Sequence, residues 1–416
     1  MRISVYGLWH LGCVTAACLS DYGHEVVGVD EPNIVGGLNL GVAPISEPGL
    51  NDLISSGLTS GKLTFESDLE KVFGGSRVVW ITFDTPVNDA DEADSKFVID
   101  KIIKIIPFID SNSMVLISSQ LPIGSSGLIQ EKINTIRPND NITVSYSPEN
   151  LRLGKAIDVF KNPDRVVVGL DDIKKRGVIS TIFSPETKIE WMSVKSAEMT
   201  KHAINSFLAL SIVFINELSS VCESFGADIS EVERGLKTEH RIGPRSYLRA
   251  GLAFDGGTLA RDVQFLKKMC DERGLDSCFF DGILNSNLKH KQWSIKKIEQ
   301  IFPDLNNVKI GVFGIAYKKG TDTTRRSQSL EMCKQLSDKG ATVFAMDPLV
   351  KLIGSEATLI NTPDMMNDCD VIVINMIWDD VSEHVYGYLS RKTIIDPSGL
   401  LDGKRFEKYH RIGFSK

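Results

Sequence analysis

The glycines at the start of the chain are spaced for dinucleotide binding. Gly7 and Gly12 occupy the outer positions of a GxGxxG pattern, and Asp30 follows eighteen residues after Gly12. Such a turn aims backbone N–H groups and a helix N-terminus at a pyrophosphate, while the acidic residue accepts hydrogen bonds from the adenosine ribose. Because Asp30 would repel a 2′-phosphate, the pattern favours NAD over NADP.

The middle position of this pattern departs from the rule. Trp9 stands where glycine normally allows the backbone to approach the phosphates. A Rossmann-type fold that binds another ligand, or none, therefore stays open as an alternative. We still expect the whole turn to contact the cofactor, including Trp9, His10 and Leu11.

A second pair of polar residues lies within residues 196–226, which contain neither proline nor glycine before Gly226 and are typical of one long helix. Lys201 and Asn205 are four residues apart there, so they would share a face of the helix and could point at one reacting centre. A cation and an amide suit the stabilisation of an oxyanion. The spacing alone is equally compatible with a solvated surface.

Two similar segments must position these residues. Each reads as a strand, a glycine turn, a helix and a second strand: Arg2–Tyr6, Cys13–Tyr22 and Glu25–Val29 in the first, and Val308–Phe313, Ser329–Lys339 and Ala341–Ala345 in the second. Other apolar runs fit parallel strands buried on both faces: Val78–Thr82, Ser113–Ser118, Arg165–Val168, Val371–Asn375 and Thr393–Ile395. The recurrence predicts two Rossmann-like halves.

The length of 416 residues suits two or three domains. We expect an α/β protein with two Rossmann-like, doubly wound domains, 1–190 and 296–416, joined by a helical central region at 191–295. That region would include a helix at Val263–Arg273, after a loop at residues 241–257.

Composition excludes several classes of protein. A net charge of −7 opposes a nucleic-acid-binding surface, which needs clustered Lys and Arg. Seven cysteines are scattered, and neither they nor the histidines show metal-ligand spacing, so we expect reduced thiols and no metal. The chain starts directly with a strand-like segment, and no apolar run reaches the ~20 residues of a spanning helix. We therefore expect a cytoplasmic protein without a membrane segment.

Motifs in one order along nearly the whole chain resemble the UDP-glucose/GDP-mannose dehydrogenase family. They are Gly41–Leu50 (GVAPISEPGL), Thr85-Pro86, Ser119–Gly124 (SQLPIG), Pro148–Gly154 (PENLRLG), Ala197–Lys201 with Asn205, Arg241–Gly243, Phe254–Asp262 (FDGGTLARD), and Gly314–Asp322 followed by Arg325–Ser327. The resemblance implies an N-terminal NAD domain, a helical middle that forms a homodimer, and a C-terminal domain for the nucleotide diphosphate. It also implies two-step oxidation of a sugar C6 alcohol to a carboxylate, with a UDP-hexose as the expected substrate.

The same resemblance assigns roles to residues. The implied catalytic residues are Glu149, Lys201, Asn205, Thr258 and Asp262. Besides the glycine turn and Asp30, the cofactor would contact Thr85, Pro86, Gln120 and Arg325. The substrate would contact Glu149, Leu151, Lys201, Asn205, Arg241, Arg249, Phe254, Gly257 and Lys318.

The chain departs from the family at three positions within these motifs. Thr258 replaces the cysteine that would carry a thioester, Leu153 replaces a second glutamate, and Gln120 replaces a threonine. A thiol with a pKa of about 8.5 is easily activated, whereas an aliphatic hydroxyl is far less acidic. Cys270 lies roughly 18 Å further along a helix, at about 1.5 Å per residue, and cannot substitute. We expect the thioester route to be lost.

Several outcomes stay open. Hydride transfer needs only NAD, an aligned alcohol and a base. The enzyme could stop at the aldehyde, reduce a carbonyl in reverse, or oxidise the aldehyde's hydrate with Glu149 or Asp262 as base. The alternative from another class is a catalytically silent paralogue that binds nucleotide or a partner protein.

Overall fold

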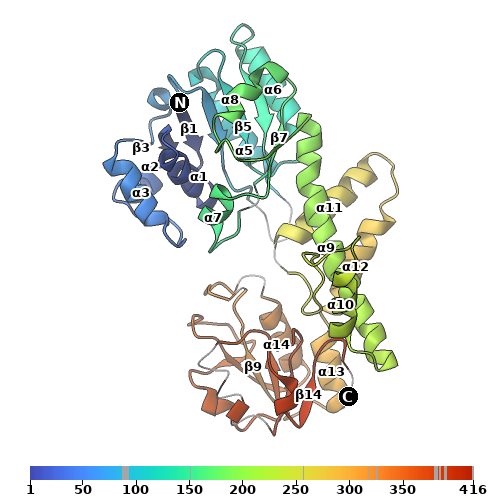
Figure 1. Ribbon diagram of the computed structural model, residues 1–416. Coiled ribbons are helices and arrows are strands. Elements are labelled where there is room, and N and C mark those ends of the chain that lie inside the picture. Colours follow the sequence, from blue (N-terminus) through green and yellow to red (C-terminus); the bar gives the residue numbers. More distant parts are fainter. Residues whose placement is uncertain are drawn as a thin grey trace. The chain divides into compact units, whose positions relative to one another are not determined.

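The computed structural model describes residues 1–86, 93–149, 151–255, 257–317, 319–324, 327–378, 383, 386–387 and 391–414. The chain divides into two compact units, Met1–Ala203 and Ile204–Lys416 (Figure 1). Each unit contains one sheet, and the boundary between them falls within the long helix α9 (Val194–Phe225).

The first unit holds an eight-stranded sheet in the order β3-β2-β1-β4-β5-β6-β7-β8. Its strands are β1 (Arg2–Tyr6), β2 (Glu25–Val29), β3 (Leu63–Glu66), β4 (Val78–Ile81), β5 (Met114–Ile117), β6 (Thr143–Tyr146), β7 (Val166–Gly169) and β8 (Ile189–Met192). All neighbouring strands are parallel except β6 and β7. The order of the first six is that of a dinucleotide-binding fold, with a reversal between β1 and β4.

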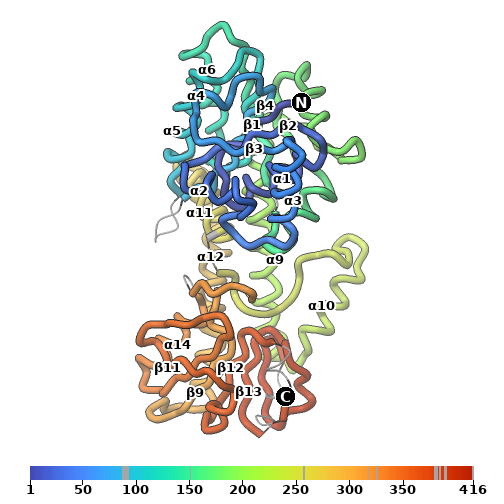
Figure 2. Tube along the Cα trace, turned by 90° about the vertical axis from the view of Figure 1, so that its left-hand side faces the viewer, coloured from blue at the N-terminus to red at the C-terminus, as the bar shows by residue number. Residues whose placement is uncertain are grey.

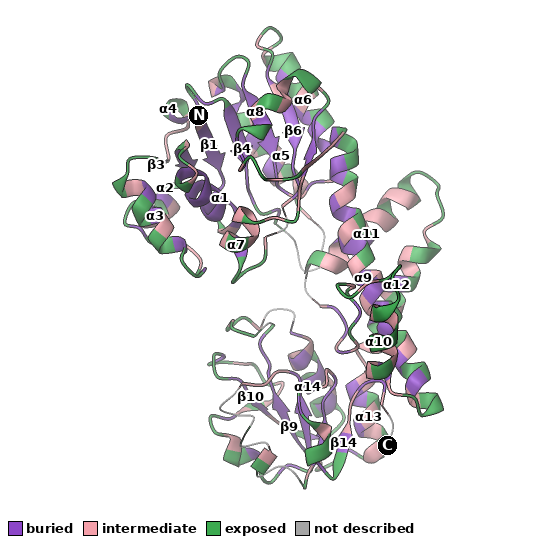
Figure 3. Cartoon of the chain, viewed as in Figure 1, coloured by how far each residue is buried: buried purple, intermediate pink, exposed green. Residues whose placement is uncertain are grey.

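Helices cover both faces of this sheet. They are α1 (His10–Asp21), α2 (Pro32–Leu38), α3 (Leu50–Thr59), α4 (Leu69–Val72), α5 (Ser95–Ile105), α6 (Ser125–Ile136), α7 (Ala156–Lys161) and α8 (Arg176–Ser180), with short 3-10 turns at Ile106–Phe108 and Ile173–Lys175. Two apolar clusters lie on the two faces, and the central strands are buried (Figure 3). Burial on both faces explains the continuous apolar runs of these strands.

The second unit combines helices with a six-stranded parallel sheet in the order β11-β10-β9-β12-β13-β14. Its strands are β9 (Lys309–Phe313), β10 (Thr342–Met346), β11 (Thr358–Leu359), β12 (Val371–Ile374), β13 (Thr393–Ile395) and β14 (Lys408–His410). Strands β9, β12 and β13 lie side by side in Figure 2. The helices are α10 (Ile229–Thr238), α11 (Gly257–Glu272), α12 (Cys278–His290), α13 (Trp293–Ile301) and α14 (Gln328–Asp338), with 3-10 turns at Pro363–Met366 and Gly403–Arg405.

The predicted fold class is confirmed: two parallel-sheet domains are connected through helices. The predicted start of one helix is wrong, since α11 begins at Gly257 and not at Val263. The earlier start has a chemical consequence, because it places Thr258 and Asp262 in the first two turns of α11, on one face.

By length and composition alone, α9 is the one helix among the described residues that could cross a membrane. Its most apolar window has a mean hydropathy of 1.5, and 44% of that window is buried inside the protein. A long helix at the core of a globular protein has the same composition.

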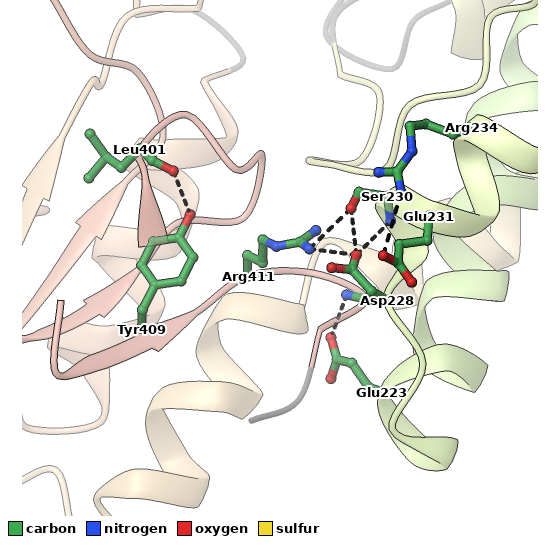
Figure 4. A network of polar contacts seen from close by, with 9 residues as sticks. Glu223, Asp228, Ser230, Glu231, Arg234, Leu401, Tyr409 and Arg411 are labelled. Carbon is green, nitrogen blue, oxygen red and sulfur yellow. Dashed lines mark hydrogen bonds and ion pairs between the residues drawn. The ribbon is translucent and has the colours of Figure 1, made fainter. Parts of the chain in front are cut away.

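The segment that follows β14 is hydrogen-bonded to the helical part of the second unit. Arg411, just after β14, donates from Nη2 to Asp228 Oδ1 at 2.5 Å, and the backbone N–H of Gly413 donates to Glu223 Oε1 at 2.9 Å (Figure 4). Asp228 also caps α10 by accepting from Ser230 N. Both side chains of the Arg411–Asp228 pair are at most one-quarter exposed.

Removal of Arg411 is expected to loosen this attachment. Arg411→Ala leaves Asp228 without its cation, and we expect the free energy of unfolding of the second unit to fall by about 1–2 kcal/mol. Arg234→Ala is the matched control, because Arg234 faces Glu231 at 3.5 Å with both side chains 70% exposed, and such pairs contribute about 0–1 kcal/mol. Urea unfolding of both variants measures the difference. Equal midpoints for the two variants would contradict the expectation.

Candidate functional site

The expected cofactor residues of the first unit lie at the carboxyl ends of its central strands. Gly7 follows β1, Asp30 follows β2, Thr85 follows β4 and Gln120 follows β5. Asp30 accepts hydrogen bonds from the backbone N–H groups of Leu8 and Glu31, and Thr85 Oγ1 donates to the carbonyl of Gln120. Thr85 is buried, and the neighbouring Pro86 is exposed. This edge, at the reversal of strand order, is where open α/β sheets bind ligands.

The glycine turn has the geometry of a phosphate cradle. Gly7 has a φ of 105°, which favours glycine, and a Cβ on Gly12 would lie 1.8 Å from the carbonyl oxygen of Gly7. Trp9 is the N-cap of α1 with a φ of −95°, so its backbone conformation does not require glycine, and its side chain is 44% exposed. The first N–H groups of α1, including those of His10 and Leu11, point out of the helix start. The turn therefore has features suited to binding a pyrophosphate.

Gly12 provides a test of this cradle. Gly12→Ala must push the turn apart, so we expect the dissociation constant for NADH to rise more than tenfold and stability to fall by about 1–3 kcal/mol. Gly127→Ala is the matched control, since Gly127 lies in α6 with no neighbouring atom within 4 Å of its Cβ position. That variant should bind NADH normally and be equally or slightly more stable. NADH titration and urea unfolding report both effects, and normal binding by Gly12→Ala would count against the cradle.

Two of the implied catalytic residues form a contact within the first unit. Lys201 Nζ donates to the carbonyl oxygen of Glu149 at 2.6 Å and lies 3.2 Å from Glu149 Oε1. Glu149 Oε2 accepts from the backbone N–H of Leu151 at 2.8 Å. Lys201 is 6% exposed, whereas the side chain of Glu149 is 33% exposed. A buried ammonium group is thus held beside a carboxylate that solvent and a ligand can reach.

The other implied catalytic residues gather within the second unit. Asn205, one turn after Lys201 on α9, donates from Nδ2 to Asp262 Oδ2 on α11. Asn205 is 6% exposed and Asp262 is fully buried. Thr258 lies one turn before Asp262 and is exposed at the start of α11, directly after Gly257. Residues more than fifty positions apart in sequence are therefore brought into two polar pairs.

A small cavity lies at the reversal of strand order in the second sheet. Its volume is about 230 Å³, and its lining includes Ala253, Tyr317 and Asn375 together with Ser327 at the N-terminus of α14. Phe254 lies beside this lining but is itself buried. Its backbone N–H and C=O both bond to the side chain of Asn287. A helix N-terminus at a switch point suits a phosphate group.

Of the four basic residues expected at the substrate, the two that the structure describes do not line that cavity. Arg241 pairs with Glu239 and its side chain is 86% exposed. Arg249 lines a separate cavity of about 490 Å³ beyond β13 and β14. The other two candidates, Lys318 and Arg325, lie outside the described residues. Within the described residues no three His, Cys, Asp or Glu side chains are grouped to hold a metal ion.

Two buried glutamates escaped the reasoning from sequence. Glu198, fully buried on α9, accepts from the backbone N–H groups of Gly124 and Ser126 and so caps α6. Glu47 accepts from the loop that follows Glu149 and from His10. Both stand within motifs of the chain, at Ala197–Lys201 and Gly41–Leu50, and an acidic residue inside an apolar motif was the one available signal.

Comparisons with known proteins agree along the whole chain. Residues 1–187, 195–289 and 311–403 match, respectively, the models of the NAD binding domain, the central domain and the UDP binding domain of the UDP-glucose/GDP-mannose dehydrogenase family. The UDP-glucose 6-dehydrogenase of Rhizobium meliloti (strain 1021) is 32% identical over 394 residues, which cover 91% of this chain and 90% of the relative.

A second relative and a solved structure extend the likeness. The UDP-glucose 6-dehydrogenase of Rickettsia bellii (strain RML369-C) is 30% identical over 436 residues and 99% of each chain. The UDP-glucose dehydrogenase structure from the archaeon Pyrobaculum islandicum aligns with a TM-score of 0.89 at 27% identity, covering 100% of this chain and 98% of the other.

Proposed function

This chain belongs to the UDP-glucose/GDP-mannose dehydrogenase family, and from that premise we propose that it oxidises the C6 alcohol of a nucleotide sugar once, to the aldehyde. It is an NAD-dependent oxidoreductase that acts on CH–OH groups of nucleotide sugars. The observation that carries the proposal of a working enzyme is the contact between Lys201 and Glu149, because a silent paralogue has no need of a buried ammonium group beside an accessible carboxylate.

In the single oxidation, different residues accept the proton and stabilise the negative charge. When bound, NAD would supply the acceptor for the hydride that leaves C6. The hydroxyl proton passes to Glu149, whose side chain is accessible and lies at the carboxyl end of β6. Lys201, beside Glu149, stabilises the alkoxide as the proton leaves, and family membership assigns the same role to Asn205, four residues later on α9. One alcohol and one NAD thus give one aldehyde, one NADH and one proton.

Thr258 is the reason for proposing that oxidation stops there. A second oxidation through a covalent intermediate needs a nucleophile ionised near neutral pH, and a hydroxyl is not. Leu153, which replaces the second glutamate, is 38% exposed and offers no proton acceptor. Both the nucleophile and one of the two acidic groups for the second step are absent.

The substrate in this proposal is a UDP-hexose. The UDP binding domain match covers residues 311–403, and the described cavity at the N-terminus of α14 lies within that range and the loop before α11. The diphosphate would accept hydrogen bonds from the first N–H groups of α14. The nucleobase and the sugar would contact the other residues that line this cavity.

The expected homodimer and cytoplasmic location complete the proposal. Helix α9 exposes Phe207, Phe214 and Val221, which are seven residues apart and so form one stripe, with exposed fractions of 65%, 48% and 50%. Such a stripe favours packing against a second copy. Sedimentation equilibrium would give twice the mass of 45.9 kDa if the proposal is right.

The deciding experiment counts NADH formed per sugar consumed. Purified protein is incubated with NAD and a panel of UDP-, GDP- and dTDP-hexoses and their N-acetyl forms, with a carbonyl reagent to trap aldehyde. One NADH per sugar with trapped aldehyde supports the proposal. Two NADH with an acid product would contradict the single oxidation, and no NADH with any sugar would favour the silent paralogue, which Trp9 and Thr258 leave as the second candidate.

A further inference from the structure

Glu47 is a buried carboxylate that receives hydrogen bonds from two functional segments of the first unit. It lies between α2 and α3, and its side chain is 1% exposed. Its Oε2 accepts from the backbone N–H of Gly154 at 2.8 Å, and its Oε1 accepts from that of Ala156 at 2.9 Å. The imidazole Nε2 of His10 lies 2.9 Å from Oε2.

The partners of Glu47 lie in two segments of the chain, the cofactor turn and the segment that follows the proposed base. His10 is the first residue of α1, next to Trp9 in the cofactor turn. Gly154 and Ala156 end the segment that starts at Glu149, and Ala156 begins α7. One carboxylate therefore touches both the turn expected to hold the pyrophosphate and the segment that follows the proposed base.

The protonation states at this contact follow from the geometry. Burial disfavours the charged form of Glu47, but the hydrogen bonds from Gly154, Ala156 and His10 outweigh it and lower the pKa of that carboxyl. An ionised carboxylate only accepts, so His10 Nε2 carries the hydrogen of the contact. Each of the three donors then has a suitable acceptor, and a neutral amide in place of Glu47 could not serve all of them.

We propose that Glu47 is a positioning residue that couples the cofactor turn to the segment following Glu149, so that NAD binding sets the place of the catalytic carboxylate. The inference rests on the proposed function. Movement of the first turn of α1 on cofactor binding would shift His10, and the hydrogen bonds of Glu47 would pass that shift to Gly154 and Ala156. The left-handed φ of 86° at Gly154 keeps its N–H directed at Glu47 only while this segment holds its shape.

Three variants separate the two arms of the coupling, which are the contact of Glu47 with His10 and its hydrogen bonds from Gly154 and Ala156. Glu47→Gln weakens both arms, because an amide presents a donor where three donors converge. His10→Ala removes only the arm to α1 and leaves the hydrogen bonds from Gly154 and Ala156 intact. Asp52→Asn is the matched control, a nearby but exposed acidic residue in the first turn of α3. The protein is used as the full chain, and NADH is the probe.

Two measurements that need no sugar report the coupling. NADH titration gives the dissociation constant, and hydrogen exchange with and without NADH follows the amides of Gly154 and Ala156. In the wild type and in Asp52→Asn, NADH should slow exchange of both amides at least tenfold. In His10→Ala, compared at an NADH concentration that saturates the variant, this slowing should vanish. In Glu47→Gln the same amides should exchange faster even without NADH, and NADH affinity should fall by about tenfold, as for one lost hydrogen bond to a charged group.

The outcomes distinguish the coupling from the function on which it rests. If NADH slows the amides of His10→Ala as much as those of the wild type, the coupling is overturned and the proposed function stands. Unchanged affinity in Glu47→Gln, within a factor of two, would overturn it as well. Wild-type protein that binds no NADH would remove the proposed function and the coupling together. If Glu47→Gln does not fold, His10→Ala still decides the question.

Discussion

The variant Thr258→Cys is expected to form one additional NADH per active site, from a second oxidation of the sugar, and then to stop. The residue is exposed at the N-terminus of the sixteen-residue helix α11, where the helix dipole lowers the pKa of a thiol. The introduced thiolate would add to the aldehyde, and hydride transfer to a second NAD would leave a thioester. Release of the acid needs activated water, and Leu153 cannot supply the base. The second NADH should therefore appear as a burst equal to the enzyme concentration.

Restoration of the second carboxylate should convert this burst into turnover. Leu153 is 38% exposed, so Leu153→Glu places its charge partly in water at little cost in desolvation. The triple change Thr258→Cys, Leu153→Glu and Gln120→Thr should approach two NADH per sugar with an acid product. Rapid-mixing absorbance gives the burst, and mass spectrometry of the quenched protein detects the acyl group. Thr258→Ser is the control, expected to keep one NADH per sugar; a burst with the serine variant too would show that the thiol is not the cause.

The centre of each sheet could be predicted from sequence because burial leaves a plain signal there. Runs such as Val78–Ile81 and Val371–Ile374 are apolar at every position, since both faces of a central parallel strand are covered. Strand β6 escaped because its sequence, TVSY, is half polar. The hydroxyl of Ser145 is fully buried and donates to the carbonyl of Gly169 at 2.7 Å, so the polar side chain is satisfied inside the protein.

The predicted start of α11 is also wrong, for a different reason. Adjacent glycines normally indicate a loop, and the helix was expected to begin at Val263. In the structure Gly257 is its first residue. Because the helix begins six residues earlier, the position of Thr258 is helical, and its relation to Asp262 follows from the helix period.

Only part of the site could be predicted from the sequence. The turn from Gly7 to Gly12 is local, so spacing alone indicated its role. The contact of Lys201 with Glu149 joins residues 52 positions apart, and only the resemblance to a family assigned catalytic roles to both. The contacts of Glu47 with His10 and with Gly154 connect three separate segments of the chain, and no pattern of residue types predicts these contacts.

Lys201→Met is expected to lower kcat by about 100- to 1000-fold, the usual effect of removing one donor that stabilises a developing oxyanion. Methionine preserves the length and apolar stem of the side chain, which is 8% exposed, so the helix should keep its packing. The cofactor contacts expected at Gly7, Asp30 and Thr85 are untouched, and NADH affinity should stay within a factor of two. A loss confined to kcat is the signature of a group that acts on the reacting atoms.

Lys195→Met serves as the matched control because Lys195 lies on the same helix but is exposed. It should change neither kcat nor NADH affinity. Lys201→Arg should recover little activity, since the larger planar guanidinium cannot occupy the space in which one ammonium group donates to the backbone carbonyl oxygen and to Oε1 of Glu149. Retention of more than one-tenth of kcat by Lys201→Met would mean that Lys201 only holds Glu149 in place. In that case oxyanion stabilisation would have to come from Asn205, whose amide is already held by Asp262.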